Sequence, residues 1–308
     1  MSEKLTQQEK RAFREAQAKL TDVRRDSFGK WFRTKGWRHL VGWVVIVYAL
    51  FPIVFVISGS FSSGTQFSSD FFRSFTTENY VDLFSDPFRP YANWFVNTIF
   101  ISGTSAIGAV FLSALAAYAF SRLRFTGRRA GLLTLILVQM FPQLLALVAI
   151  YALLVEIGNV FPFLGIGSQI ALIMVYLGGA LGANTYLMYG FFNTIPKELD
   201  EAAKIDGATH TQIFYGMILR LAAPILAVIG LLSFIGTSSD FILANIILTK
   251  PETKTLAVGL YMYVSDQFGQ NWTVFAAGAV LAAIPIVALF LYLQRYIVSG
   301  LTGGAVKG

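Results

Sequence analysis

The sequence predicts an all-α polytopic membrane protein with six transmembrane helices, and three observations support this fold class. Of the 308 residues, 55% are hydrophobic and only 13% are charged, which is about half the charged share of an ordinary soluble domain. The mean hydropathy is +0.61. Long runs contain no charged residue, the first from His39 to Ser69, and such runs are long enough to cross a bilayer as helices.

The apolar runs divide into six expected spans, separated by glycine, proline and charged residues. The first span ends near Gly59, and the second ends where a basic cluster begins at Arg122. The third ends at a glycine-rich turn that begins with Glu156. The fourth leads into a polar segment, and the fifth and sixth follow that segment. We expect the spans at about residues 40–58, 94–121, 130–155, 168–195, 221–248 and 272–294.

Lys and Arg are distributed unevenly between the two sides of the expected membrane. Most of them lie in residues 1–38, in the acid-free turn 122–129, in the polar segment after the fourth span and at the C-terminal end. The positive-inside rule therefore predicts a multi-pass protein of the cell (inner or cytoplasmic) membrane with both termini cytoplasmic. This distribution explains the formal net charge of +7 without a nucleic-acid partner. The opposite side holds only Arg73, Arg89, Lys250 and Lys254.

The chain divides into a polar N-terminal arm, residues 1–38, and a six-helix membrane domain, residues 39–308. The arm carries eleven Lys and Arg against five Asp and Glu, so we expect it to lie on the anionic inner leaflet, with a specific protein partner as the alternative. A cytoplasmic tail, residues 295–308, is expected to end the domain.

The segment 194–220 is a polar island between two apolar blocks, and its local signals predict two short helices. Pro196 can open the first helix, because its missing N–H is not needed there. Gly207 is placed to end that helix in a left-handed turn. Thr209 followed by Gln212 predicts a capping box that starts the second helix. The alanines that follow Glu201 let another protein approach closely.

The same segment resembles the EAA loop of the membrane subunits of ABC importers. Glu201, Ala202, Ala203, Gly207 and Leu219 match the pattern of that loop, with the expected nine-residue spacer, whereas Met217 and Arg220 replace its usual Ile and Pro. Residues 255–259 and 294–308 are similar to corresponding parts of maltose-type importer subunits. The chain is therefore identified as a member of the maltose, maltodextrin or trehalose type of carbohydrate importer permease.

This resemblance implies the type I ABC importer permease fold and a set of partners. The chain would form half of the translocation pathway for a disaccharide or oligosaccharide, beside a second homologous permease subunit. Two ATPase subunits would hold the ATP and Mg, and an extracellular sugar-binding protein would deliver the sugar. The cytoplasmic helix pair would dock on an ATPase subunit. The residues implied in that coupling are Leu199, Glu201, Ala202, Ala203, Asp206 and Gly207.

Several residue types needed for chemistry are missing or isolated. The sequence has no cysteine, two histidines and no phosphate-binding P-loop, so we expect no metal site, no cofactor on this chain and no enzymatic activity. An ion-coupled secondary transporter or a channel is the alternative, because such proteins keep ionisable residues inside the membrane. The candidates are Glu156 and Asp240, but Asp240 is expected near the outer surface, where Ser238, Ser239 and Asp240 can cap a new helical segment.

Residues that contact the sugar cannot be assigned from the sequence. Polar and aromatic side chains within the spans are candidates for sugar contact, and each is equally a candidate for a hydrogen bond between helices. The outer segments 60–90 and 250–271 are expected to face the binding protein. The candidates for sugar contact are Gln139, Gln143, Tyr176, Asn184, Tyr186, Ser239 and Asn245.

Overall fold

The computed structural model describes residues 28–67, 74–265 and 269–305, and residues 1–27 of the predicted arm lie outside these ranges. Within the described ranges all regular structure is helical. The all-α prediction is therefore confirmed. The chain forms two compact units, residues 1–55 and 56–308.

The first unit contains α2 (Phe28–Trp31), a π-helix (Phe32–Gly36) and most of α3 (Trp37–Ser60). The π-helix and α3 together make a helix of 29 residues from Phe32 to Ser60, and none of its most apolar stretch is buried. An apolar helix with its side chains exposed in this way is typical of a span that faces lipid. The expected first span lies inside it.

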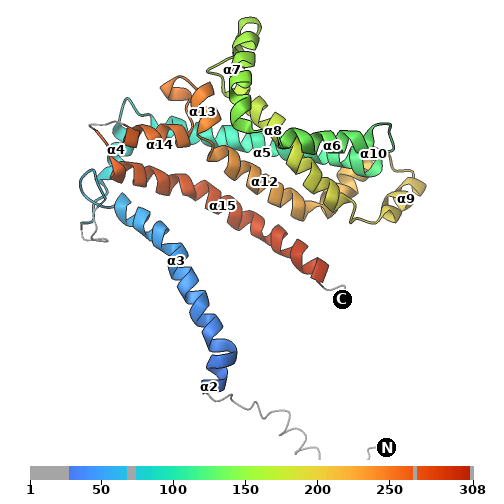
Figure 1. Ribbon diagram of the computed structural model, residues 1–308, viewed down its shortest axis with the longest axis horizontal. Coiled ribbons are helices and arrows are strands. Elements are labelled where there is room, and N and C mark those ends of the chain that lie inside the picture. Colours follow the sequence, from blue (N-terminus) through green and yellow to red (C-terminus); the bar gives the residue numbers. More distant parts are fainter. Residues whose placement is uncertain (1–27, 68–73, 266–268, 306–308) are drawn as a thin grey trace, which may run out of the picture. The chain divides into compact units, whose positions relative to one another are not determined.

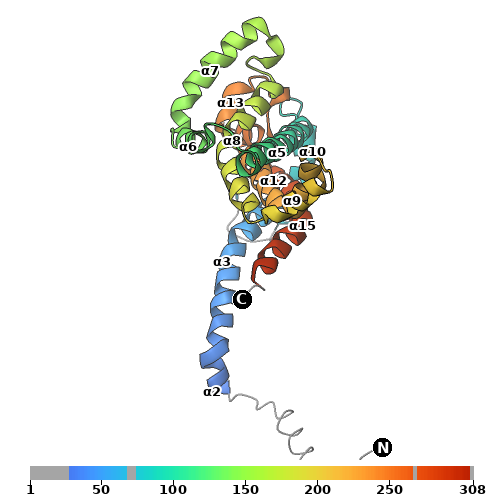
Figure 2. The same ribbon diagram turned by 90° about the vertical axis from the view of Figure 1, so that its right-hand side faces the viewer.

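The second unit is built around α5 (Tyr91–Arg122), which packs against α8 (Gln169–Phe192) and α12 (Ala223–Ser238). Figures 1 and 2 both place these three helices side by side, and α15 (Trp272–Ala305) packs against α12. Small side chains allow helices to approach closely in a membrane. The buried small residues of α5 are Ser102, Ser105, Ala106, Ala109, Ser113, Ala114, Ala117 and Ser121.

The expected third and fifth spans are not continuous helices. The third is α6 (Arg128–Gln139) and α7 (Gln143–Val160), which meet at 100°. Pro142 precedes α7, and proline interrupts a helix because it lacks an N–H and clashes with the preceding turn. The fifth span ends at Ser238 instead of about residue 248, and the separate helix α13 (Ile242–Ile247) follows it.

In the described part of the chain, four helices are long and apolar enough to cross a membrane. The number becomes six if two bent pairs each count as one span: α6 with α7, and 210–221 with α12, which are bent by 78°. Six spans therefore remain a prediction. The last helix, α15, continues to Ala305, beyond the expected end at Gln294, so residues 295–305 of the predicted tail are helical. Residues 306–308 lie outside the described residues.

Short helices connect the long ones: α4 (Glu78–Ser85), a 3-10 turn (Pro162–Leu164), a second 3-10 turn (Pro251–Thr253) and α14 (Leu256–Ser265). Three apolar clusters fill the second unit. The one that supports the predicted coupling segment includes Tyr118, Phe192, Ile195, Ile213, Phe214 and Ile218.

Candidate coupling site

The segment 194–220 forms the predicted helix pair. Its first helix is α9 (Lys197–Ile205), and its second begins as α10 (His210–Ile213). Gly207, between them, has a φ of 84°, a left-handed conformation that glycine adopts without steric cost. The N–H of Gly207 donates to the carbonyl of Lys204 at 3.0 Å, and that of Ala208 donates to Ala203 at 2.9 Å. These two bonds are the Schellman motif that ends many helices.

The start of the second helix is fixed by a capping box, as predicted. The backbone N–H of Gln212 donates to Oγ1 of Thr209 at 3.3 Å, and the N–H of Thr209 donates to Oε1 of Gln212 at 2.8 Å. Each bond satisfies an N–H that a helix start leaves without a partner. A π-helix (Phe214–Ile218) and α11 (Leu219–Leu221) continue α10 up to the break at Ala222. Arg220 is exposed on α11.

One face of α9 is apolar and exposed. Ala202 is exposed, Leu199 is 41% exposed and Ile205 is 86% exposed. The spacing of three residues places them on one side of the helix. Glu201 and Asp206 are also exposed, whereas Ala203 is half-buried against the apolar cluster beneath α9. A surface of small and branched apolar side chains beside carboxylates is suited to a protein contact.

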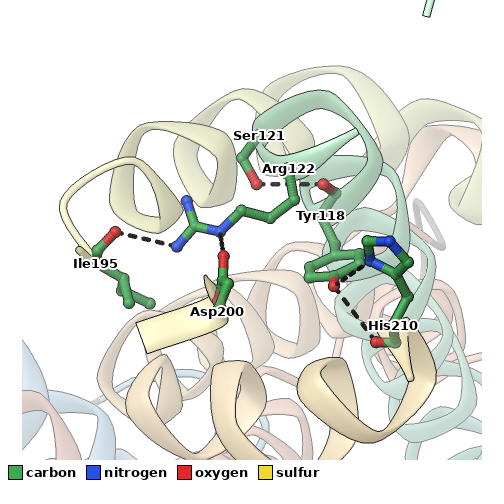
Figure 3. Close-up of polar contacts among 6 residues, drawn as sticks. All are labelled: Tyr118, Ser121, Arg122, Ile195, Asp200 and His210. Atoms are coloured by element: carbon green, nitrogen blue, oxygen red, sulfur yellow. Dashed lines mark hydrogen bonds and ion pairs between the residues drawn. The ribbon is translucent and has the colours of Figure 1, made fainter. Parts of the chain in front are cut away.

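A buried ion pair holds α9 to the end of α5. Nε of Arg122 lies 2.5 Å from Oδ2 of Asp200, and the two side chains are only 4% and 8% exposed. The same guanidinium donates from Nη2 to the carbonyl of Ile195 at 3.0 Å. Figure 3 shows Arg122 reaching from α5 to both partners. One side chain therefore fixes both the first turn of α9 and the turn that precedes it.

A second contact holds the start of α10 to the same helix. The hydroxyl of Tyr118 lies 3.2 Å from Nδ1 of His210 and donates to the His210 carbonyl at 3.3 Å. The ring of Tyr118 also packs against Phe214, with 5.1 Å between centroids. Tyr118 and Arg122 are four residues apart and thus lie on one face of α5.

The inward-facing half of this site was not predicted from the sequence: Tyr118, Arg122, Asp200 and His210. One local signal was available for Asp200. It lies three residues before Ala203, so the two side chains are neighbours on the surface of α9, and Ala203 packs on the buried cluster beneath that helix. No local pattern points to Arg122 as the partner, because α5 and α9 are far apart in the sequence.

A cavity of about 990 Å³ lies among α5, α6, α7, α8, α12 and α13. Three of the predicted sugar candidates line it, namely Gln139, Tyr176 and Asn184. Gln139 donates to the carbonyl of Gly179 at 2.9 Å, and Asn184 donates to Oγ of Ser233 at 3.2 Å. Ser105, Thr134, Thr237 and Asp240 were not among those candidates and also line the cavity.

Three other candidates for sugar contact are not part of this wall. Tyr186, Ser239 and Asn245 are exposed and do not line the cavity. The side chain of Gln143 lies outside the described residues.

The two acidic candidates, Glu156 and Asp240, have different environments. Asp240 accepts hydrogen bonds from the hydroxyl of Tyr176 and from the N–H of Ala244, both at 3.1 Å. Asp240 lies one residue before Phe241, the N-cap position of α13, and its carboxylate satisfies one N–H of the first turn of that helix. Glu156 is exposed. Among the described residues, no group of three or more His, Cys, Asp or Glu side chains could hold a metal ion.

The segments expected to face the binding protein are tied to the start of α5. Nε1 of Trp94 donates to the carbonyl of Pro251 at 2.7 Å, and the N–H of Leu256 donates to Oγ1 of Thr98 at 2.7 Å. Arg89 lies over the ring of Tyr263, 4.7 Å from its centroid. Burial raises the pKa of Tyr263 to about 12; the charge of nearby Asp86 adds to the shift and that of Arg89 opposes it.

Comparisons with known proteins agree with this geometry. Residues 91–303 match the family described as "Binding-protein-dependent transport system inner membrane component". The chain is 41% identical over 268 residues to the galactooligosaccharides transport system permease protein GanQ of Bacillus subtilis (strain 168), covering 86% of this chain and 92% of GanQ. It is 40% identical over 267 residues to the maltodextrin transport system permease protein MdxG of the same strain, with the same coverage.

A third relative and a solved structure extend the comparison. The maltose/maltodextrin transport system permease protein MalG of Escherichia coli (strain K12) is 39% identical over 282 residues, which cover 88% of this chain and 95% of MalG. In fold, the chain resembles a crystal structure of a bacterial ABC transporter involved in the import of the acidic polysaccharide alginate, with a TM-score of 0.71 and 22% identity over 96% of this chain and 99% of the other. The ABC importer permease fold is therefore confirmed.

Membership of a family of transport components also confirms that this chain is not itself an enzyme. On its sequence, its helices and these comparisons, the chain belongs to the family of inner-membrane components of binding-protein-dependent transport systems.

Proposed function

We propose that this chain is one permease subunit of an ATP-driven importer for a disaccharide or oligosaccharide of the maltose, maltodextrin or trehalose class. It forms half of the translocation pathway beside a second homologous permease subunit. Two ATPase subunits hold the ATP and Mg, and an extracellular sugar-binding protein delivers the sugar. Both termini of the chain are cytoplasmic.

The exposed apolar face of α9 is the observation that most supports this assignment. Ile205 is 86% exposed and lies beside Leu199 and Ala202. Exposing this apolar surface to water is unfavourable, and exposed apolar patches of this kind mark protein contacts. Glu201 and Asp206 border this face and can pair with basic residues of an ATPase subunit. A buried ion pair between Asp200 and Arg122 holds this helix to α5. A displacement of α9 by a partner would therefore be transmitted to α5.

The sugar class is supported by the named relatives and by the cavity. Two relatives are named for maltodextrin or maltose/maltodextrin, and one for galactooligosaccharides. The volume of about 990 Å³ is at the upper end of the range of small-molecule sites. Amide, hydroxyl and aromatic groups on its wall are the types that bind neutral sugars.

The test is reconstitution of the complex in lipid vesicles with its second permease, its ATPase subunits and its binding protein. We expect uptake of labelled maltodextrins or trehalose that requires ATP, and cross-linking of the variant Ala202→Cys to an ATPase subunit. The purified chain alone is expected to hydrolyse no ATP, because it lacks a P-loop.

The matched cross-linking control is Tyr186→Cys, since Tyr186 is exposed on α8 within an expected span. Capture of the ATPase by the control and not by Ala202→Cys would overturn the assigned docking face. Uptake driven by an ion gradient in the absence of ATP would favour a secondary transporter instead.

A further inference from the structure

We propose that α5 is the helix that receives the motion of the helix pair, and that Arg122 is the positioning residue that transmits it. This inference rests on the proposed function, because it names the route from the ATPase contact to the translocation pathway. Its basis is the set of contacts by which the last turn of α5 holds both α9 and α10.

The first of these contacts fixes α9 from two sides. Arg122 forms the ion pair with Asp200, the fourth residue of α9, and donates to the carbonyl of Ile195 before the helix starts. Both side chains are almost fully buried. A displacement of α9 therefore acts directly on the guanidinium of Arg122. Because both charges are buried, water does not screen the attraction between them.

The second contact fixes α10 to the same face of α5, one turn earlier. Tyr118 lies within hydrogen-bonding distance of two atoms of His210 and packs against Phe214. Because Tyr118 and Arg122 occupy one helical face, α9 and α10 cannot separate from α5 independently. The helix pair and the end of α5 move as one body.

The covalent connection from α10 to α12 offers a weaker route. After α10, the chain passes through a π-helix and a break at Ala222, where the axis turns by 78° before α12 begins. At a bend of this size, a displacement along the axis of the first helix is not transmitted along the axis of α12. The polar contacts to α5 cross no such break.

A shift of α5 would change the wall of the cavity. Ser105 and Ala109 of α5 line it, opposite residues of α6 and α7. The hydroxyl of Ser105 is buried and, among the described residues, has no hydrogen-bond partner. Movement received at Arg122 therefore reaches the surface that the sugar would pass.

The ion pair does not satisfy all the hydrogen-bonding groups of its two side chains. Within the described residues, Nη1 of Arg122 and Oδ1 of Asp200 are buried and have no hydrogen-bond partner. Arginine and a carboxylate can form two parallel bonds, and unsatisfied buried groups are unfavourable. These two atoms therefore add to the cost of burying the pair, and a movement of α9 that gave either of them a partner would be favourable.

The experiment compares Asp200→Asn and Arg122→Met in the reconstituted complex, with Arg124→Met as the matched control on an exposed arginine. The measurement is the amount of labelled maltodextrin transported per ATP hydrolysed. We expect this ratio to fall at least about fivefold in both variants, the lower end of usual coupling between two sites. Arg124→Met is expected to leave the ratio unchanged.

The double variant Arg122→Met with Asp200→Leu separates coupling from folding. Replacing a buried ion pair with apolar residues often preserves stability, so assembly and thermal stability should return while the transport ratio stays low. Full return of the ratio would show that the pair has only a structural role.

Two outcomes separate this inference from the proposed function. If uptake by the native complex does not require ATP, the proposed function fails; if it does and both single variants couple normally, only the role of α5 is overturned.

Discussion

The hydroxyl of Tyr176 on α8 donates a 3.1 Å hydrogen bond to Oδ1 of Asp240, between α12 and α13. The same oxygen accepts the N–H of Ala244 at 3.1 Å. Asp240 thus joins α8 to α13 on the wall of the cavity, and both hydrogen bonds depend on its Oδ1 as the acceptor. A carboxamide offers the same acceptor in nearly the same shape.

We therefore predict that Asp240→Asn retains sugar uptake at close to the normal rate. Asp240→Leu removes the oxygen that accepts both hydrogen bonds and leaves the Tyr176 hydroxyl and the Ala244 N–H without partners, at a cost of about 1–3 kcal/mol for each buried group. The measurement is initial uptake together with the unfolding temperature of each variant. A large loss in Asp240→Asn with normal stability would mean that the charge itself is needed, as in a proton-coupled carrier.

A second prediction concerns the elbow of the helix pair. Gly207 has a φ of 84°, and a Cβ there would meet no atom within 4 Å, so the penalty for a side chain is conformational alone. Gly207→Ile should cost about 1–2 kcal/mol and should lower uptake while ATP hydrolysis continues, because the two helices lose their fixed angle. The spans should remain folded.

The matched variant for the elbow is Gly207→Asn, since asparagine tolerates the left-handed conformation. It should retain most of the uptake that Gly207→Ile loses. Normal transport by Gly207→Ile would remove the role assigned to the elbow.

The capping box gives a third prediction. Thr209→Ala removes the oxygen that accepts the Gln212 N–H and should destabilise the start of α10 by about 1 kcal/mol. Hydrogen exchange of the peptide that spans residues 208–214 should become faster. Thr209→Ser keeps the oxygen and should exchange like the native chain; equal exchange in all three proteins would contradict the assigned cap.

A fourth prediction tests the packing at the other end of α5. A Cβ at Gly259 would lie 2.1 Å from the ring of Trp94, which is fully buried. The rigid indole cannot move aside while Nε1 donates to Pro251. Gly259→Ala should therefore lower the free energy of unfolding by about 1–3 kcal/mol.

The control for this packing is Gly190→Ala on α8, where an added Cβ meets no atom within 4 Å. Thermal unfolding in detergent compares the two variants. The close contact at Trp94 would be refuted by equal unfolding temperatures for Gly259→Ala and the native protein.

Features determined by near neighbours in the chain were predictable from the sequence. The left-handed turn at Gly207, the capping box of Thr209 and Gln212, and the hydrogen bond from the Ala244 N–H to Asp240 depend on residues within a few positions of one another. The apolar runs placed most span boundaries within a few residues, because a helix must stay apolar across the bilayer.

Features that need partners from distant parts of the chain were decided only by the tertiary structure. No repeat or spacing in the sequence predicts the pairing of Arg122 with Asp200. Pro142 predicts an interruption between α6 and α7, but not that the two helices meet at 100°. The cavity likewise forms only when six helices meet. Side-chain type and local spacing determine what a segment can become, whereas burial and pairing depend on which other segment packs against it, and that is a property of the whole fold.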